Sequence, residues 1–121
     1  MPISKTPYSF ISNTERHDKK GSHRTAWVVL EDNTISFLDS FGRPPNYSTF
    51  PREYHAFTKG HKFRYNPKVI ESLDGFTCGH FCIYMIYYRS LGIDLKYIYN
   101  SFTNDLDKND MLVVNFVNMI S

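Results

Sequence analysis

The sequence of 121 residues lacks any long hydrophobic run. A membrane-spanning helix needs about 18 to 20 consecutive apolar residues, and the longest apolar stretch here runs only from Phe81 to Tyr88. The segment from Met1 to Tyr8 also lacks the apolar block of a secretory signal peptide. We therefore expect neither a membrane-spanning chain nor secretion by that route.

Cysteine is scarce, with only Cys78 and Cys82. Two cysteines are too few for a disulfide framework, and a bridge between neighbouring turns of one helix would strain the disulfide geometry. Reduced thiols are typical of proteins inside the cell, so we expect an intracellular location.

A large charge excess is also missing, because the formal net charge is only +2. This balance does not indicate a dedicated nucleic-acid-binding protein. Basic residues cluster in two places: Arg16, Lys19, Lys20 and Arg24, and then Lys59, Lys62 and Arg64. Each cluster fits either a solvated surface or a weak contact with a polyanion such as DNA.

Aromatic residues, in contrast, are abundant and make up 17% of the chain. Aromatic side chains bury a large area each, so even a short chain can build a core from them. The length is that of a single domain over residues 1–121. The apolar share of 41% and the charged share of 21% argue against disorder.

Hydrophobic patterning predicts an α+β domain, with strands in the first half and helices in the second. The extended stretches are Tyr8–Asn13, Thr25–Leu30, Ile35–Asp39 and Lys62–Tyr65, with a polar loop over Thr14–Ser22 and a short helix over Phe50–Phe57. The turn residues from Glu31 to Thr34 predict that the second and third stretches form a β-hairpin.

Three helices are predicted in the second half. The residues from Cys78 to Leu91 are apolar on nearly every side, which is typical of a central, buried helix, and Gly92 can end it. Asp94 can cap a second helix that continues to Phe102. Asp107 to Asn109 begin a third, whose inward side chains are expected to be Met111, Leu112, Val114, Phe116, Val117 and Ile120.

Cys78 is the first candidate for chemistry. It stands where the apolar helix begins, and the positive end of a helix dipole favours the nucleophilic thiolate. Gly79 leaves room beside the sulfur for a substrate carbonyl. A cysteine at such a position can also be a small buried apolar residue, which is the interpretation we favour for Cys82. A zinc site from both cysteines and a histidine matches no common ligand spacing.

His23 and Asp39 are the candidates for a general base and its orienting acid. His23 immediately precedes one strand of the predicted hairpin, and Asp39 ends the other strand. Adjacent antiparallel strands would therefore place the two side chains close together. His80 lies so near Cys78 in sequence that it remains an alternative base.

The order of histidine, acid and cysteine resembles the adenovirus-type cysteine proteases, the adenain family, and especially the protease-like proteins of adenovirus-related viruses and virus-like transposons. The resemblance covers nearly the whole chain. The residues that carry it are Phe10 to Thr14, Gly21-Ser22-His23, Phe37 to Gly42 with Pro44-Pro45, Tyr65-Asn66, Ser72, Cys78 to Cys82, Arg89 to Gly92, and Asn109-Asp110.

This resemblance implies a papain-like cysteine protease core of the adenain type, in which a small mixed or antiparallel sheet packs on a central buried helix. By position it implies that His23 is the base, Asp39 the orienting acid and Cys78 the nucleophile. The backbone N–H of Cys78 would help to form the oxyanion hole. The implied activity is a cysteine endopeptidase that processes structural precursor proteins of a virus or transposon.

The resemblance also bears on cofactors and location. The reaction requires no cofactor and no metal, whereas the family implies an activating short peptide or DNA. It further implies a location in the host nucleus or virus factory, or within the virion, and a polypeptide substrate.

Three departures from the family pattern stand out. Arg24 follows the histidine where the family has Trp, and only seven residues precede the first predicted strand where the family has a helix. Glu71 occupies the position of a Gln that donates to the oxyanion. An ionised carboxylate cannot donate a hydrogen bond, and the loss of one such donor lowers the rate roughly 100- to 1,000-fold. A protonated Glu71 could donate, which would allow activity below neutral pH.

Two alternatives to an active endopeptidase follow. The first is a weakened or inactive protease-fold protein with a structural or binding role, as Glu71, Arg24 and the short N-terminal segment suggest. The second is an isopeptidase for ubiquitin-like modifiers, whose triad order is similar but whose motifs fit the DSFG and CGHFC segments less well.

Overall fold

The structure is a computed structural model that describes residues 7–14, 23–72 and 76–121. Within these ranges the elements are β1 (Tyr8–Asn13), β2 (Arg24–Val29), β3 (Ile35–Leu38), α1 (Arg52–Thr58), β4 (Phe63–Tyr65), α2 (Cys78–Ser90), α3 (Leu95–Asn100) and α4 (Leu106–Ile120). The predicted α+β class is therefore confirmed. Most of the loop predicted over Thr14–Ser22, with its basic residues Arg16, Lys19 and Lys20, lies outside the described residues.

The four strands form one mixed sheet in the order β1-β2-β3-β4, in which β4 runs parallel to β3 and the other neighbours are antiparallel. β2 and β3 are the predicted hairpin. Its turn places Asn33 at a φ of 66°, a left-handed conformation that asparagine tolerates. Because the hairpin is antiparallel, the residue before β2 and the residue after β3 lie at the same end of the sheet.

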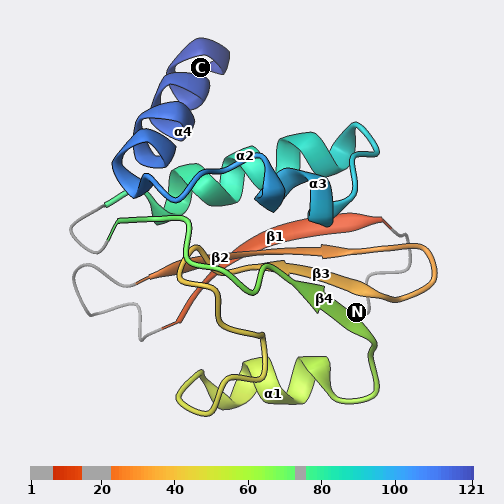
Figure 1. The fold of residues 1–121 in the computed structure, drawn as a ribbon. Coiled ribbons are helices and arrows are strands. Elements are labelled where there is room, and N and C mark those ends of the chain that lie inside the picture. Colours follow the sequence, from red (N-terminus) through yellow and green to blue (C-terminus); the bar gives the residue numbers. More distant parts are fainter. Residues whose placement is uncertain (1–6, 15–22, 73–75) are drawn as a thin grey trace.

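Helices cover both faces of this sheet, with α1 on one face and α2 and α3 on the other, and α4 packs on α2 (Figure 1). All but the first residue of β2 are buried, because alternate side chains point to two covered faces. The core facing α1 is aromatic and includes Trp27, Phe37, Phe50 and Tyr54. The core facing α2 includes Ala26, Val28, Leu38, Phe81, Cys82 and Met85. The aromatic excess of the sequence therefore goes largely into the α1 side.

The helix α2 is central, but it is not buried on every side as predicted. Phe81 and Met85 on its sheet side are 0% exposed, whereas Ile83 is 36% and Tyr87 is 38% exposed. The helix packs against β2 on one side and against α3 and α4 on others, which leaves part of its surface open to solvent.

The inward face of α4 also differs from the prediction. Its buried residues are Asn109, Val113 and Phe116. Met111, Leu112 and Ile120 are exposed by 65%, 41% and 48%, so the expectation that they pack inward is wrong. The helix packs on α2 and projects beyond it, and only one narrow stripe is therefore covered (Figure 1).

Two further expectations concern surfaces. In the part of the chain that the structure describes, no helix combines the length and the hydropathy that crossing a bilayer requires. Lys59, Lys62 and Arg64 are exposed, which fits either a solvated surface or a contact with a polyanion. The guanidinium of Arg64 lies 3.7 Å from the Asp94 carboxylate.

Candidate active site

Cys78 is the first residue of α2, as the sequence predicts, and Thr77 precedes it as the N-cap residue. The Cys78 Sγ accepts a hydrogen bond from the backbone N–H of Arg24 at 3.4 Å. The first N–H groups of a helix have no partner within the helix, so the sulfur lies where the local dipole favours negative charge. Cys78 is buried but retains 9% exposure, unlike Cys82 at 0%.

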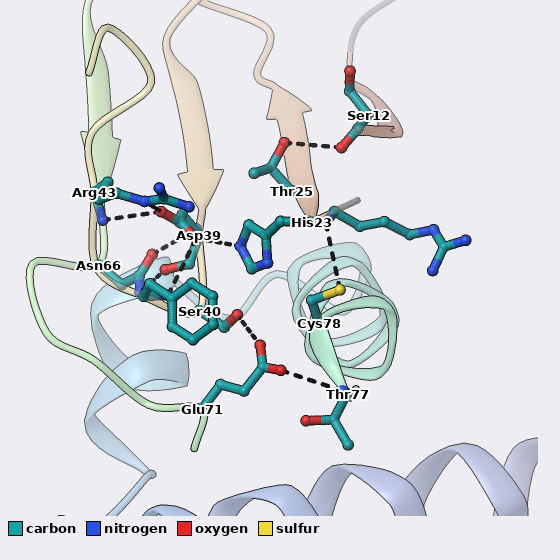
Figure 2. Close-up of polar contacts among 12 residues, drawn as sticks. Ser12, His23, Thr25, Asp39, Ser40, Arg43, Asn66, Glu71, Thr77 and Cys78 are labelled. Carbon is teal, nitrogen blue, oxygen red and sulfur yellow. Dashed lines mark hydrogen bonds and ion pairs between the residues drawn. The ribbon is translucent and has the colours of Figure 1, made fainter. Parts of the chain in front are cut away.

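His23 and Asp39 meet at the end of the hairpin, as their positions predict. The Nε2 of His23 donates to Oδ1 of Asp39 at 2.5 Å. Figure 2 shows the imidazole of His23 between the Asp39 carboxylate and Cys78. The bond through Nε2 leaves Nδ1 to interact with the sulfur, so the structure brings the three predicted residues together. The ring of Phe41 stacks on the imidazole, with the ring centroids 4.6 Å apart and an interplanar angle of 20°.

The thiol and the imidazole favour an ion pair. Burial opposes ionisation of Cys78, but hydrogen bonding with His23 and with the Arg24 N–H lowers the pKa of the thiol below its ordinary value. Burial likewise opposes charge on His23, but Asp39 and Cys78 together raise its pKa to about 9. Both shifts favour a thiolate beside an imidazolium, and the thiolate is the nucleophilic form of cysteine.

The carboxylate of Asp39 is held in the turn that follows β3. Its Oδ1 accepts the Phe41 N–H at 3.1 Å, and its Oδ2 accepts the Arg43 side chain at 2.6 Å. Although burial alone would raise the pKa of Asp39, hydrogen bonds from His23 and Arg43 keep it below the ordinary range. Asp39 therefore stays ionised and holds the imidazole in one orientation.

Two further features fix this turn. The side chain of Asn66 bonds to both backbone polar groups of Asp39: it donates to the carbonyl at 2.7 Å and accepts the N–H at 3.1 Å. Gly42 has a φ of +80°, and a Cβ there would lie 2.9 Å from the carbonyl carbon of Lys68. Only glycine suits both the conformation and the space at this position.

Glu71 lies next to the start of α2 and is 1% exposed. Ser40 donates its hydroxyl to Oε1, and the backbone N–H of Thr77 donates to Oε2 at 3.2 Å (Figure 2). Burial raises the pKa of Glu71 more than Ser40, His23 and Thr77 lower it. The carboxylate acts here as an acceptor, in a place where the family resemblance implies a donor.

Asp110 of α4 supports the same region. Ser72 donates its hydroxyl to Asp110 at 2.6 Å, and Thr77 donates its hydroxyl to the same carboxylate at 3.1 Å. These bonds connect the residues on both sides of the segment 73–75, which lies outside the described residues, to the C-terminal helix. The start of α2 is therefore held by two independent acidic side chains, Glu71 and Asp110.

The other predicted candidates do not join the site. Cys82 is 0% exposed, and burial raises the pKa of its thiol well above the ordinary value, which makes it unreactive. His80 makes no hydrogen bond to Cys78 in the described part of the chain, where the sulfur instead interacts with His23 and Arg24. The zinc alternative finds no support, since the described residues contain no group of three or more His, Cys, Asp or Glu side chains able to hold a metal.

Three contributors to the site were given no role from the sequence: Arg43, Ser40 and Asn66. Ser40 lies within the DSFG segment and Arg43 directly follows it, yet sequence alone does not tell which way their side chains point. Asn66 is 0% exposed, and an asparagine between a strand and Pro67 is an ordinary turn signal. A buried polar side chain of this kind is recognised only once its partners are known.

Cys78, His23 and Asp39 thus lie in contact in that order and provide a nucleophile, a proton carrier and an orienting anion. These are the groups that thiol-based acyl transfer requires. Comparisons with protein families, with curated proteins and with solved structures find no match to this chain. Function is therefore inferred from the geometry of Cys78, His23 and Asp39, together with the resemblance of the sequence motifs.

Proposed function

We propose that this protein is a cysteine endopeptidase with a papain-like core of the adenain type. The observation that carries the proposal is the convergence of Cys78, His23 and Asp39 from three separate parts of the chain. Isolated buried cysteines have raised pKa values, as Cys82 does. The pKa of Cys78 moves the other way because a histidine and a backbone N–H face its sulfur.

The proposed reaction begins when the Cys78 thiolate attacks a peptide carbonyl carbon. The tetrahedral intermediate collapses as His23 gives its proton to the leaving amine, which produces a thioester and a free amine. Water then attacks the thioester while His23 takes up its proton, and the thiolate leaves as the acid product forms. The backbone N–H of Cys78 is the oxyanion donor that the start of α2 supplies.

By resemblance, the substrate would be a structural precursor protein of a virus or transposon. The same resemblance supports activation by a peptide or by DNA, and a location in the host nucleus, the virus factory or the virion. The substrate, the activator and the location could each differ without changing the chemistry at Cys78.

A second candidate function is a protease-fold protein with weakened or absent activity and a binding role. The observation that favours it is Glu71, whose oxygens accept bonds from Ser40 and Thr77 beside the sulfur. An anion at this place would repel a developing oxyanion. The Cys78 thiolate would then be reactive although turnover would be slow.

Alkylation rates test whether Cys78 is activated. We expect iodoacetamide to label Cys78 at least about tenfold faster at pH 7 than Cys82, because thiolate content and access both favour Cys78. His23→Ala should remove most of this rate, whereas His55→Ala, a histidine of α1, serves as the matched control and should not change it. Equal rates in the wild type and His23→Ala would contradict an activated thiol.

Peptide hydrolysis separates the two candidate functions. We expect Glu71→Gln to raise turnover of fluorogenic peptides at neutral pH by roughly 10- to 100-fold, because an amide can donate to the oxyanion. The ratio of turnover in Glu71→Gln to turnover in the wild type should decrease as the pH falls and Glu71 becomes protonated. Glu53→Gln on the exposed surface of α1 is the control. If Cys78 is activated but neither the wild type nor Glu71→Gln hydrolyses any peptide, the binding role is correct.

A further inference from the structure

Arg24, at the start of β2, contacts the nucleophile Cys78 through its backbone. Its N–H donates to the Cys78 Sγ at 3.4 Å, so its Cα is fixed beside the sulfur. The residue begins β2, directly after His23, and is itself exposed. The backbone of Arg24 therefore lies beside the sulfur, and its side chain begins next to the nucleophile.

The side chain of Arg24 extends over Gly79 at the start of α2. A Cβ placed on Gly79 would lie 3.6 Å from Cδ and 3.7 Å from Nη1 of Arg24. These would be ordinary van der Waals distances for an added methyl group, so the side chain of Arg24 lies over Gly79 and leaves room for about one carbon atom there. The guanidinium therefore lies beside Gly79, the residue that follows the nucleophile.

Within the described ranges, Arg24 forms no ion pair. The ion pairs there join Asp39 to His23 and Arg43, and Asp94 to Arg64. The carboxylates of the site, Asp39 and Glu71, are buried at 0% and 1% exposure and are engaged with other donors. An exposed guanidinium that has no acidic partner among the described residues is suited to bind a carboxylate through two parallel hydrogen bonds.

We propose that Arg24 is a specificity residue that selects a substrate with a carboxylate next to the scissile bond. The inference rests on the proposed endopeptidase function and adds the chemical class of the substrate. An extended peptide advances about 3.3 Å per residue, so a guanidinium beside residue 79 reaches side chains within about two residues of the bond that Cys78 attacks. Aspartate or glutamate side chains at those positions are the expected ligands.

Charged and neutral alkylating reagents test this inference without requiring turnover. Iodoacetate and iodoacetamide differ by one carboxylate, so the ratio of their rates at Cys78 reports the local attraction for an anion. We expect Arg24→Gln to lower this ratio about three- to fivefold, as befits one exposed ion pair, and Arg24→Lys to retain most of it. The matched control is Arg64→Gln, an exposed arginine of β4 that should leave the ratio unchanged.

The outcomes separate this inference from the proposed function. A ratio that is the same in the wild type, Arg24→Gln and Arg24→Lys overturns the role of Arg24, even where iodoacetamide shows an activated thiol. A slow reaction with both reagents and a ratio that still depends on Arg24 contradicts activation but supports the carboxylate site. Where peptides are cleaved, Arg24→Gln should lower kcat/KM for substrates with an acidic residue beside the cut by a similar factor. For substrates without an acidic residue there, Arg24→Gln should change kcat/KM by less than about twofold.

Discussion

Asp39 and Glu71 are two buried acidic side chains of the same site: Asp39 bonds to His23, and Glu71 bonds to Ser40 and to the backbone of Thr77. They are equally hidden from solvent, with exposures of 0% and 1%. Their pKa values nevertheless move in opposite directions, down for Asp39 and up for Glu71. Burial alone therefore does not determine the charge of either carboxylate.

The difference lies in the donors that each carboxylate meets. Asp39 accepts from two cationic side chains, His23 and Arg43, and charge-assisted hydrogen bonds offset the cost of desolvating an anion. Glu71 accepts from a hydroxyl and a backbone N–H, which are neutral donors. Asp39 is thus built to remain an anion that orients imidazole, whereas the surroundings of Glu71 would suit a neutral amide as well.

The largest effect is expected for Asp39→Asn. The amide cannot balance the imidazolium, and the loss of such an orienting acid lowers kcat by about 10⁴-fold in a related triad. Removing one partner of a buried ion pair also costs about 3 kcal/mol of unfolding free energy, measurable by urea denaturation at pH 7. The exposed substitution Asp107→Asn controls for the loss of one charge.

The pH dependence of this loss has a definite sign. Since the folded pKa of Asp39 is lowered, its stabilisation is present above the unfolded value of about 3.9 and disappears as the pH falls through the folded value. The gap between the wild type and Asp39→Asn should therefore close in acid. A gap that is constant from neutral pH to strongly acidic pH would mean that Asp39 contributes packing rather than charge.

Glu71→Gln is expected to change stability in the opposite direction and by less. A raised folded pKa means that wild-type folding is favoured below the unfolded pKa of about 4.3 and loses stability as the pH rises through the folded value. The substitution should stabilise the protein by about 1 kcal/mol at pH 7, because it removes the cost of a poorly supported anion. Urea denaturation at pH 7 and at pH 4 should show this gain disappearing in acid. Destabilisation of Glu71→Gln at pH 7 would mean that the ionised Glu71 carboxylate stabilises the fold, as we expect for Asp39.

Part of this comparison was predictable from the sequence. The hairpin signal fixed the relation between His23 and Asp39, because antiparallel pairing brings the residue before one strand next to the residue after the other. The apolar run after Thr77 predicted a helix that begins at Cys78. Local patterns were sufficient in both cases, since each element is defined by its own residues.

The remainder depends on how separate segments meet. The cation that distinguishes Asp39 is Arg43, which reaches it only because the turn through Gly42 folds back on the carboxylate. The prediction of the inward face of α4 was wrong for a similar reason. Met111 and Val113 are both apolar, and only the position of α2 determines which of them is covered. Periodicity identifies a helix but does not choose between neighbouring apolar stripes.

The smallest effect tests how Asp39 divides its charge between two cations. Arg43 shares the carboxylate with His23 and so weakens the support that the imidazolium receives. Arg43→Gln should therefore raise the pKa of His23 slightly above its present value of about 9, whereas Arg43→Lys should keep it close to that value. Glu71→Gln should move the pKa of His23 the other way, because it removes a nearby negative charge.

Titration of the His23 ring protons by NMR spectroscopy measures these shifts directly. Because the folded pKa of His23 is raised, its stabilisation is complete below the unfolded value of about 6.5 and is lost as the pH rises through about 9. Arg43→Gln should extend this stabilised range upward while lowering overall stability, since its guanidinium also lies 4.7 Å from the ring centroid of Phe50. A pKa of His23 that falls in Arg43→Gln would show that Arg43 mainly positions Asp39, because a displaced carboxylate supports the imidazolium less than a shared one.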